Sequence, residues 1–312
     1  MENLIIMGSG PAGLSAALYA SRSALEPIVI AGDQRGGQIT LTQDMENYPG
    51  FPEGVGGFEL AELMEKQAVR FGARISSDAV TEVDLSKQPF AVRTREKNYE
   101  TKAVIIATGA SPRTLDVPGE KEYTGKGVSY CATCDGFFYQ DKSVVVVGGG
   151  DSAVDEGLFL TKFASKVTIV HRRNRLRADP ILQERAKNNE KMAYIWDSVV
   201  SQVLGDDSGV KGVRLKNVKT DSESTYDSDG VFIYIGHIPN TTLFKDQLEM
   251  DEEGFLITDK RQKTSVEGVF AAGDVQDPVY KQAVTSAGTG AIAAIEAEKF
   301  IAELEGKAYP GK

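Results

Sequence analysis

Three short runs of branched apolar residues, each closed by a glycine turn, dominate the hydrophobic pattern of the chain. They cover residues 4–7, 144–147 and 103–107. Continuous apolar runs without alternation are typical of strands that are buried on both faces of a parallel sheet. We therefore predict that these runs form central parallel strands.

Two of the runs open the same succession of elements. Each is followed by a glycine turn, a helical stretch and a second strand, at residues 14–21 and 27–31 in the first unit and 154–163 and 166–170 in the second. This order is the βαβ motif. The two units start 140 residues apart, which is too far for a solenoid repeat. The pattern predicts an α/β protein with two Rossmann-like nucleotide-binding domains.

The length of the chain agrees with two domains. It has 312 residues, and one hydrophobic core stops growing at roughly 250–300 residues. Turn-like sequences at 110–113 and 237–240 are the expected crossings between the domains. The polar segments 220–230 and 251–253 are predicted to be solvated hairpin loops.

Charge and the N-terminal sequence exclude several classes of function. The 35 Lys and Arg residues against 45 Asp and Glu residues give a net charge of −10, which disfavours nucleic acid as a partner. Glu2 stands where a signal peptide has basic residues, and Gly8 ends the first apolar run early. We expect a cytoplasmic protein with no membrane partner.

The first glycine turn fits the dinucleotide-binding pattern G-x-G-x-x-G. Its glycines allow a tight turn, close approach of the backbone to a pyrophosphate, and packing of helix on strand. The alternative is a purely structural turn. Asp33, 20 residues past Gly13, is the candidate for binding the ribose, although the strand ends just before it. The predicted contacts of the turn are Gly8, Gly10, Pro11, Ala12 and Gly13.

The second glycine turn fits G-x-G-x-x-A and is followed by arginines instead of a ribose-binding acid. Guanidinium groups suit the 2′-phosphate of NADPH, so the sequence predicts NADPH over NADH. The alternative is a solvated basic surface. The predicted contacts are Gly148, Gly150, Asp151, Ser152, Ala153, His171, Arg172, Arg173 and Arg177.

The two cysteines form a C-x-x-C pair, Cys131 and Cys134, 17 residues before Gly148. A zinc site needs about four ligands, and the sequence adds only two histidines, so we expect no metal. The remaining interpretation is a redox disulfide. Asp135 is the nearest acid–base group and a catalytic candidate, or else a turn-capping residue.

The ordered set of motifs resembles the low-molecular-weight thioredoxin reductases along nearly the whole chain. Each motif alone is weak, but their order is specific. The matching segments are 8–13, 36–38, 46–50, 107–109, 131–138, 148–153, 171–173 and 268–274.

The resemblance implies domain bounds, roles for the two cysteines, an oligomeric state and FAD contacts that composition and spacing do not give. It implies that residues 1–112 and 244–312 form a discontinuous FAD domain and that 113–243 form an inserted NADPH domain carrying the disulfide. It also implies that Cys134 faces the flavin, that Cys131 attacks thioredoxin, and that the protein is a homodimer. The further FAD contacts implied are Gly37, Gln38, Asn47, Thr108, Gly109, Gly273, Asp274, Lys281, Gln282 and Ala283.

The sequence-based function is therefore thioredoxin-disulfide reduction, with electrons passing from NADPH through FAD and the Cys131–Cys134 pair. Three alternatives stay open at this point. The donor could be ferredoxin, the acceptor could be another dithiol protein, or the protein could be a non-catalytic redox sensor that uses the same disulfide as a switch.

Overall fold

The computed structural model describes residues 1–42, 45 and 47–307. The chain divides into two compact units, Met1–Ser111 with Ile238–Lys312 (unit 1) and Pro112–His237 (unit 2). The sequence-based bounds were 112/113 and 243/244, so residues 238–243 fall in unit 1 instead of the inserted unit. The crossings are two short paired strands, β7 (Ala110–Pro112) and β16 (His237–Pro239).

Unit 1 is built on a mixed sheet with a parallel centre. Strand β6 pairs β1 on one edge, and on the other edge its first half pairs β5 and its second half pairs β17. The order is β3-β2-β1-β6-β5-β4, with β17 beside β6. The strands are β1 (Glu2–Met7), β2 (Ile28–Ile30), β3 (Arg74–Ser76), β4 (Val80–Asp84), β5 (Phe90–Thr94), β6 (Asn98–Ile106) and β17 (Val269–Ala271).

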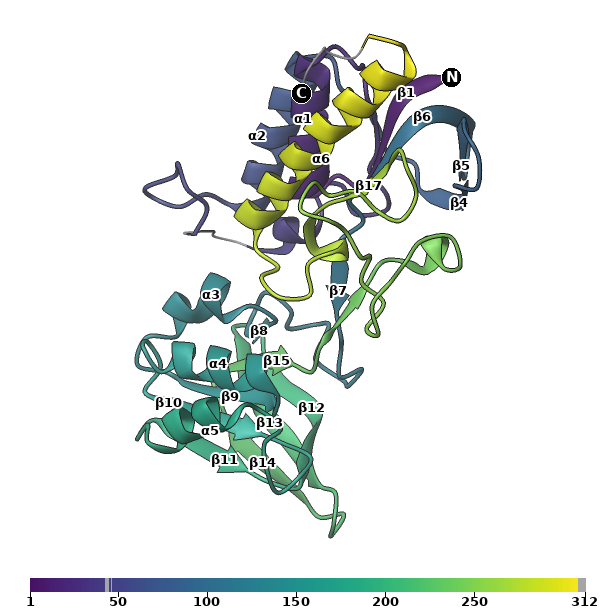
Figure 1. The fold of residues 1–312 in the computed structure, drawn as a ribbon. Helices are drawn as coiled ribbons and strands as arrows, with labels where there is room; N and C mark the ends of the chain where they lie inside the picture. The colour runs from purple at the N-terminus through teal and green to yellow at the C-terminus, as the bar shows by residue number, and fades with distance from the viewer. Residues whose placement is uncertain (43–44, 46, 308–312) are drawn as a thin grey trace. The chain divides into compact units, whose positions relative to one another are not determined.

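Three helices of unit 1 lie side by side in Figure 1: α1 (Pro11–Arg22), α2 (Gly57–Arg70) and α6 (Ala283–Leu304). Alanines of α1 pack against alanines of α6 in the core, and small side chains let the two backbones come close. At the closest point a methyl group on Gly290 would lie 2.1 Å from the carbonyl oxygen of Ala12. The short helical turns of this unit are η1 (Gln38–Leu41), η3 (Thr242–Phe244) and η4 (Gly273–Val275).

Unit 2 has an all-parallel sheet in the order β11-β10-β9-β15-β8. Its strands are β8 (Val128–Ser129), β9 (Ser143–Gly148), β10 (Lys166–Val170), β11 (Met192–Ile195) and β15 (Gly230–Tyr234). Successive valines of β9 belong to two different cores. The continuous apolar run is therefore explained by a strand buried on both faces.

The two faces of this sheet are covered by different elements. The helical side belongs to a core that includes residues of α4 (Asp151–Leu160) and α5 (Pro180–Lys187). The opposite side belongs to a core shared with an antiparallel sheet. That sheet consists of β12 (Ser198–Asp206), β13 (Gly209–Asn217) and β14 (Glu223–Asp227). The short helices of unit 2 are α3 (Ala132–Asp135) and η2 (Gly136–Tyr139).

The predicted α/β class with two Rossmann-like units is confirmed. The order β3-β2-β1-β6-β17 in unit 1 matches β11-β10-β9-β15-β8 in unit 2. Among the described residues, no helix is long and apolar enough to cross a membrane.

The prediction that residues 220–230 form a solvated loop is wrong. Residues 223–227 are the strand β14, whose backbone pairs with β13. The segment looks like a loop because an exposed edge strand tolerates charged side chains. Only Tyr226 points inward enough to form a 2.9 Å hydrogen bond with the hydroxyl of Thr168.

The contact of α1 with α6 gives a stability prediction. Gly290→Ala is expected to destabilise the protein by about 1–3 kcal/mol, because the added methyl group meets backbone that cannot move aside. The matched control is Gly288→Ala in the same helix, where a methyl group meets nothing within 4 Å and helix propensity improves. Urea unfolding measures both variants. Equal stability of the two would contradict the described packing.

Candidate functional site

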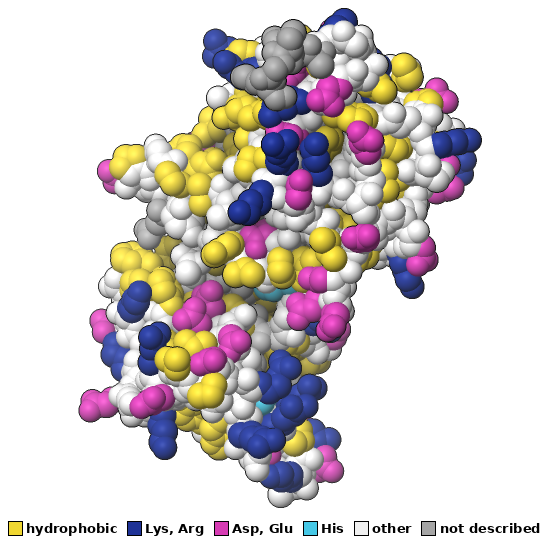
Figure 2. All heavy atoms as spheres, viewed as in Figure 1, with side chains coloured by type: hydrophobic (Ala, Val, Ile, Leu, Met, Phe, Trp, Pro, Cys, Tyr) yellow, Lys and Arg dark blue, Asp and Glu magenta, His cyan; other side chains and the backbone are white. Residues whose placement is uncertain are grey.

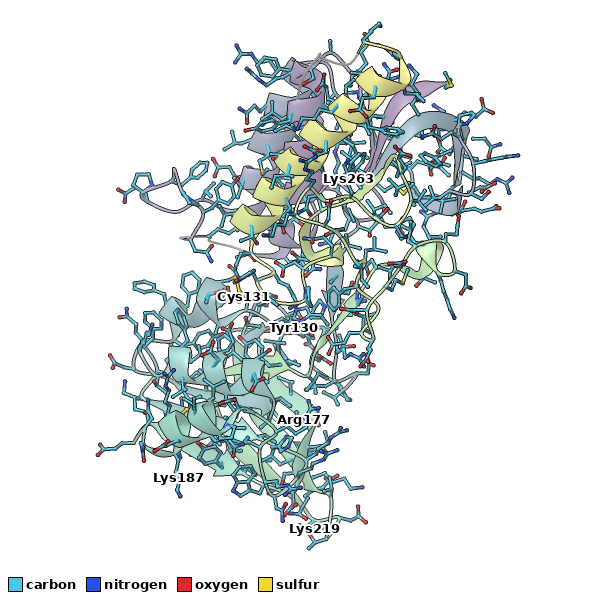
Figure 3. The ribbon with its side chains drawn as sticks, viewed as in Figure 1. Tyr130, Cys131, Arg177, Lys187, Lys219 and Lys263 are labelled. Carbon is cyan, nitrogen blue, oxygen red and sulfur yellow. A yellow bond between two sulfur atoms is a disulfide. The ribbon has the colours of Figure 1, made fainter. Side chains whose placement is uncertain are left out.

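The cysteine pair lies at the start of the short helix α3. Cys131 directly precedes the helix and Cys134 is within its single turn. The two form a disulfide with their Cα atoms 5.3 Å apart, as the sequence predicts. Figure 3 labels Cys131 and its neighbour Tyr130 beside α3. Both cysteines are partly exposed, so an incoming thiol can approach the disulfide.

Asp135 is tied to the cysteine pair through Ser129. The Ser129 hydroxyl donates to Asp135 Oδ2 at 2.6 Å and accepts the backbone N–H of Cys131 at 3.1 Å. Burial raises the pKa of Asp135, and the Ser129 hydrogen bond opposes this rise. A carboxyl group with a raised pKa beside a disulfide is suited to proton transfer during thiol exchange.

A buried glutamate that sequence reasoning missed anchors Tyr130. Glu120 is only 3% exposed, and its carboxylate accepts the Tyr130 hydroxyl at 2.8 Å and the N–H groups of Leu115 and Asp116. No sequence motif links Glu120 with these three donors, so the sequence does not reveal the cluster. Glu120 therefore fixes the residue that precedes Cys131.

The first glycine turn joins β1 to α1 in the predicted place. Gly8 has a φ of +108°, and a methyl group on Gly13 would lie 1.9 Å from the Gly8 carbonyl oxygen. The helix starts without a side-chain cap and without an acid in its first turn. The first N–H groups of α1 are therefore left for an anionic ligand.

A second loop lies against this turn. A methyl group on Gly37 would lie 2.8 Å from the Cα atom of Gly10, and the N–H of Gly36 donates to the buried hydroxyl of Ser9 at 3.0 Å. Gln38, at the start of η1, donates through its side chain to the carbonyl oxygen of Ala110. The structure thus brings residues 8–13 and 36–38 together.

The remaining residues predicted for the first site also have defined partners in unit 1. The side chain of Asn47 donates to Gln282 Oε1 at 3.3 Å. The hydroxyl of Thr108 donates to the carbonyl oxygen of Asn240 at 2.8 Å, and the N–H of Asn240 donates to the Gly109 carbonyl at 3.0 Å. Glu46, in the motif that the resemblance uses, lies outside the described residues.

The C-terminal part of unit 1 supplies a half-buried carboxyl, that of Asp274. Ser286 donates to Asp274 Oδ1 at 2.9 Å, while burial raises the pKa of Asp274. Its neighbour Gly273 has a φ of +76° and faces Ala12 of the first turn. Burial also lowers the pKa of Lys281, and Ala283 begins α6.

Asp33 has a protein partner that the sequence does not reveal. Arg95 Nη1 and Nη2 bind Asp33 Oδ1 and Oδ2 at 2.6 and 2.9 Å. Hydrogen bonding to Arg95 lowers the pKa of Asp33. The pair is exposed, and a ribose contact of Asp33 remains a prediction.

The second glycine turn joins β9 to α4 and has His171 packed on it. A methyl group on Gly149 would lie 2.4 Å from the His171 ring. His171 is 7% exposed, and burial lowers its pKa. The helix N-terminus is held by Asp151, whose Oδ1 accepts the N–H of Asp179 at 2.6 Å. The His171 ring thus leaves no room for a side chain at Gly149.

The arginines after β10 surround two adjacent cavities in unit 2. The first, of about 390 Å³, is lined by Arg173, Arg175, Leu176, Arg177 and Gln183. The second, of about 440 Å³, is lined by Arg172, Arg173, Asn174, Arg175, Asp197, Val218 and Lys219. Figure 2 shows basic side chains gathered in this part of the molecule, and Figure 3 labels Arg177 and Lys219 there.

Sequence reasoning missed two cations of this region. Arg175 stands between the predicted Arg173 and Arg177 and could have been found from the same run of basic residues. Lys219 lies just after β13, which pairs with β12, and its Nζ atom donates to Asp197 Oδ2 at 2.8 Å in the lining of the second cavity. The backbone of Arg177 also donates to the Gly149 carbonyl oxygen at 2.6 Å, which joins the arginines to the glycine turn.

Comparison with known proteins identifies the family. Residues 2–290 match the pyridine nucleotide-disulphide oxidoreductase family. A thioredoxin reductase of Rickettsia felis is 55% identical over 302 residues, covering 96% of this chain and 97% of the relative. The chain belongs to the thioredoxin reductases of this family. The resemblance seen in the sequence is confirmed, and the protein is an oxidoreductase.

Further relatives agree with this membership. A thioredoxin reductase of Coxiella burnetii is 49% identical over 311 residues, covering 97% of each chain. The crystal structure of thioredoxin reductase from Streptococcus pyogenes superposes with a TM-score of 0.91 at 46% identity, covering 97% of this chain and 99% of that one. The thioredoxin reductases thus match this chain in sequence and in fold.

Proposed function

We propose that this protein is an NADPH-dependent thioredoxin-disulfide reductase that passes electrons through FAD and the Cys131–Cys134 pair to oxidised thioredoxin. The observation that carries the proposal is the closed disulfide beside a half-buried carboxyl, Asp135, in a unit that also holds a glycine turn and arginine-lined cavities. Family membership supplies the reaction class.

The second unit fits NADPH. Gly148, Gly150, Asp151, Ser152 and Ala153 would hold the pyrophosphate at the start of α4, with His171 packed on the turn. Arg172, Arg173 and Arg177 would bind the 2′-phosphate. Arg175 lines both cavities, as Arg173 does. Several guanidinium groups at one cavity favour a phosphate over a ribose hydroxyl.

The first unit fits FAD. The uncapped start of α1 and the close approach of Gly10 to Gly37 leave a cradle that a side chain at either glycine would fill. The predicted contacts, including Asp33, Asn47, Asp274 and the segment 281–283, are proposed to hold the rest of the cofactor. When bound, FAD would supply two-electron transfer between the nicotinamide and the disulfide.

The residues around the cysteines carry out the thiol chemistry. A thiolate of the reduced pair attacks the disulfide of thioredoxin, and the second cysteine then resolves the mixed disulfide. Asp135 is proposed to exchange protons with the cysteine sulfurs, and the Ser129 hydroxyl holds both Asp135 and the Cys131 backbone in place.

A homodimer in the cytoplasm completes the proposal. Exposed apolar side chains on the helices of unit 1 support a partner surface: Tyr19 on α1, Phe58 and Leu63 on α2, and Ile292 and Ile295 on α6. Both cysteines of the chain belong to the redox pair, as expected where structural disulfides are not maintained.

The arginine assignment gives a binding prediction. The double variant Arg172→Ala, Arg173→Ala is expected to bind NADPH roughly tenfold to a hundredfold more weakly and NADH unchanged, because two charged hydrogen-bond donors to the 2′-phosphate are lost. Calorimetric titration measures both affinities. Arg214→Ala, an exposed arginine of β13, is the control. An unaltered NADPH affinity in the double variant would remove these arginines from the site.

The cysteine pair gives a turnover prediction that also separates an enzyme from a sensor. Cys131→Ser and Cys134→Ser are each expected to abolish multiple turnover, because either change prevents the exchange cycle. The assay follows NADPH consumption with a thioredoxin as acceptor, and mass spectrometry identifies the cysteine held in any mixed disulfide. A wild-type protein that stops after one turnover would identify a sensor instead.

A further inference from the structure

A second carboxyl beside the C-x-x-C loop, that of the half-buried Glu156 of α4, has no part in the mechanism above. Its Oε2 atom is buried and has no hydrogen-bond partner among the residues that the structure describes. The carboxyl group interacts with the backbone N–H of Ala132, which directly follows Cys131. Glu156 therefore reaches the peptide group inside the C-x-x-C loop.

Tyr234 lies near both Glu156 and Asp135. This residue ends β15, and its hydroxyl is likewise buried without a partner in the described part of the chain. The hydroxyl lies near the same Ala132 N–H without forming a hydrogen bond to it, and burial together with the charges of Glu156 and Asp135 raises its pKa. Polar groups from three elements, α3, α4 and β15, thus lie together at the Ala132 peptide group of the C-x-x-C loop.

The surroundings disfavour an ionised Glu156. Burial and the charge of Asp155 raise its pKa to about 7, and only the Ala132 N–H lowers it. The Tyr234 hydroxyl is buried near the Glu156 carboxyl, and the charge of Asp135 also acts on Tyr234. An unpaired buried carboxylate is costly, and a thiolate formed in the same low-dielectric region adds repulsion. A proton on the carboxyl removes both costs.

We propose that Glu156 is a positioning residue that takes up a proton when the Cys131–Cys134 disulfide is reduced, and so sets how the reduction potential of the disulfide depends on pH. This inference rests on the proposed redox function of the pair. Two electrons and one proton from the reductant break the S–S bond and leave one thiol and one thiolate. Above neutral pH the Glu156 carboxylate then gains a second proton from the solvent.

The direction of the pH effect follows from the charges. Below about pH 6 Glu156 is already protonated in the disulfide state, since its pKa is about 7, and its charge does not oppose reduction. At higher pH the ionised carboxylate opposes formation of the thiolate, so the disulfide becomes harder to reduce. A neutral side chain at position 156 therefore makes the disulfide easier to reduce at high pH and leaves its reduction at low pH unchanged.

Redox titration tests the proposal on the FAD-loaded protein. Wild type, Glu156→Gln and the control Glu190→Gln, an exposed glutamate of the same unit, are equilibrated with dithiothreitol buffers at about pH 6 and about pH 8.5, on either side of neutrality. Maleimide trapping and mass spectrometry count the free thiols. At the higher pH, Glu156→Gln is expected to favour the dithiol about tenfold, a shift of about 30 mV, with no shift at the lower pH.

The possible outcomes lead to different conclusions. A shift that is absent at both pH values, or equal at both, overturns the role of Glu156. A wild-type disulfide that never opens in the redox buffers overturns the proposed function itself. A shift in Glu190→Gln equal to that in Glu156→Gln assigns the effect to net charge and also overturns the inference.

A second measurement detects the proton itself. Infrared difference spectra of reduced minus oxidised protein at about pH 8.5, above neutrality, are expected to gain the C=O band of a protonated carboxyl. The band should persist in Asp135→Asn and vanish in Glu156→Gln. A wild-type spectrum without such a band, or a band that vanishes only in Asp135→Asn, contradicts proton uptake by Glu156.

Discussion

Both nucleotide units depend on a strand that ends in a glycine turn so tight that only hydrogen atoms fit inside it. A methyl group on Gly13 would lie 1.9 Å from the carbonyl oxygen of Gly8, and one on Gly148 would lie 2.6 Å from the Cβ atom of Ala153. These contacts fix where α1 and α4 start relative to β1 and β9. Both helices start without a side-chain cap, so their first N–H groups are free to bind an anion.

The redox pair occupies the same unit as the second turn, between β8 and β9. Ser129 at the end of β8 and Glu120 before it fix the backbone that leads into Cys131 through part-buried hydrogen bonds. From the other side, Glu156 of α4 and Tyr234 of β15 lie against the C-x-x-C loop. The elements that form the nucleotide turn therefore also determine the electrostatic surroundings of the disulfide.

Local patterns predict the parts of this protein that local forces determine. The span predicted for β10 is the observed one, and β1 and β9 extend their predicted spans by one or two residues. Buried parallel strands carry a continuous apolar run, and the glycine turns have a steric cause that the sequence displays. The disulfide is predicted by the C-x-x-C spacing, because the chain has too few further ligands for the two cysteines to form a zinc site.

The parts that sequence reasoning missed depend on partners that no local sequence pattern reveals. Asp33 is paired with Arg95, Glu120 collects donors from both sides, and Lys219 joins the arginine-lined cavities from a distant hairpin. Strand β14 is held by backbone pairing with β13 and carries few apolar side chains, so its pattern is that of a loop. In the sequence, Glu156 is indistinguishable from an exposed helical glutamate, and only the structure shows that its Oε2 atom is buried.

In the proposed function, electrons from NADPH reach the disulfide through a flavin held in unit 1. An anaerobic titration of the purified protein with NADPH, NADH and reduced ferredoxin tests this route directly, followed by flavin absorbance, with oxidised thioredoxin added at the end. NADPH is expected to bleach the flavin at far lower concentration than NADH, and thioredoxin is expected to restore the colour. Bleaching by ferredoxin alone would rule out NADPH as the donor and assign a different one.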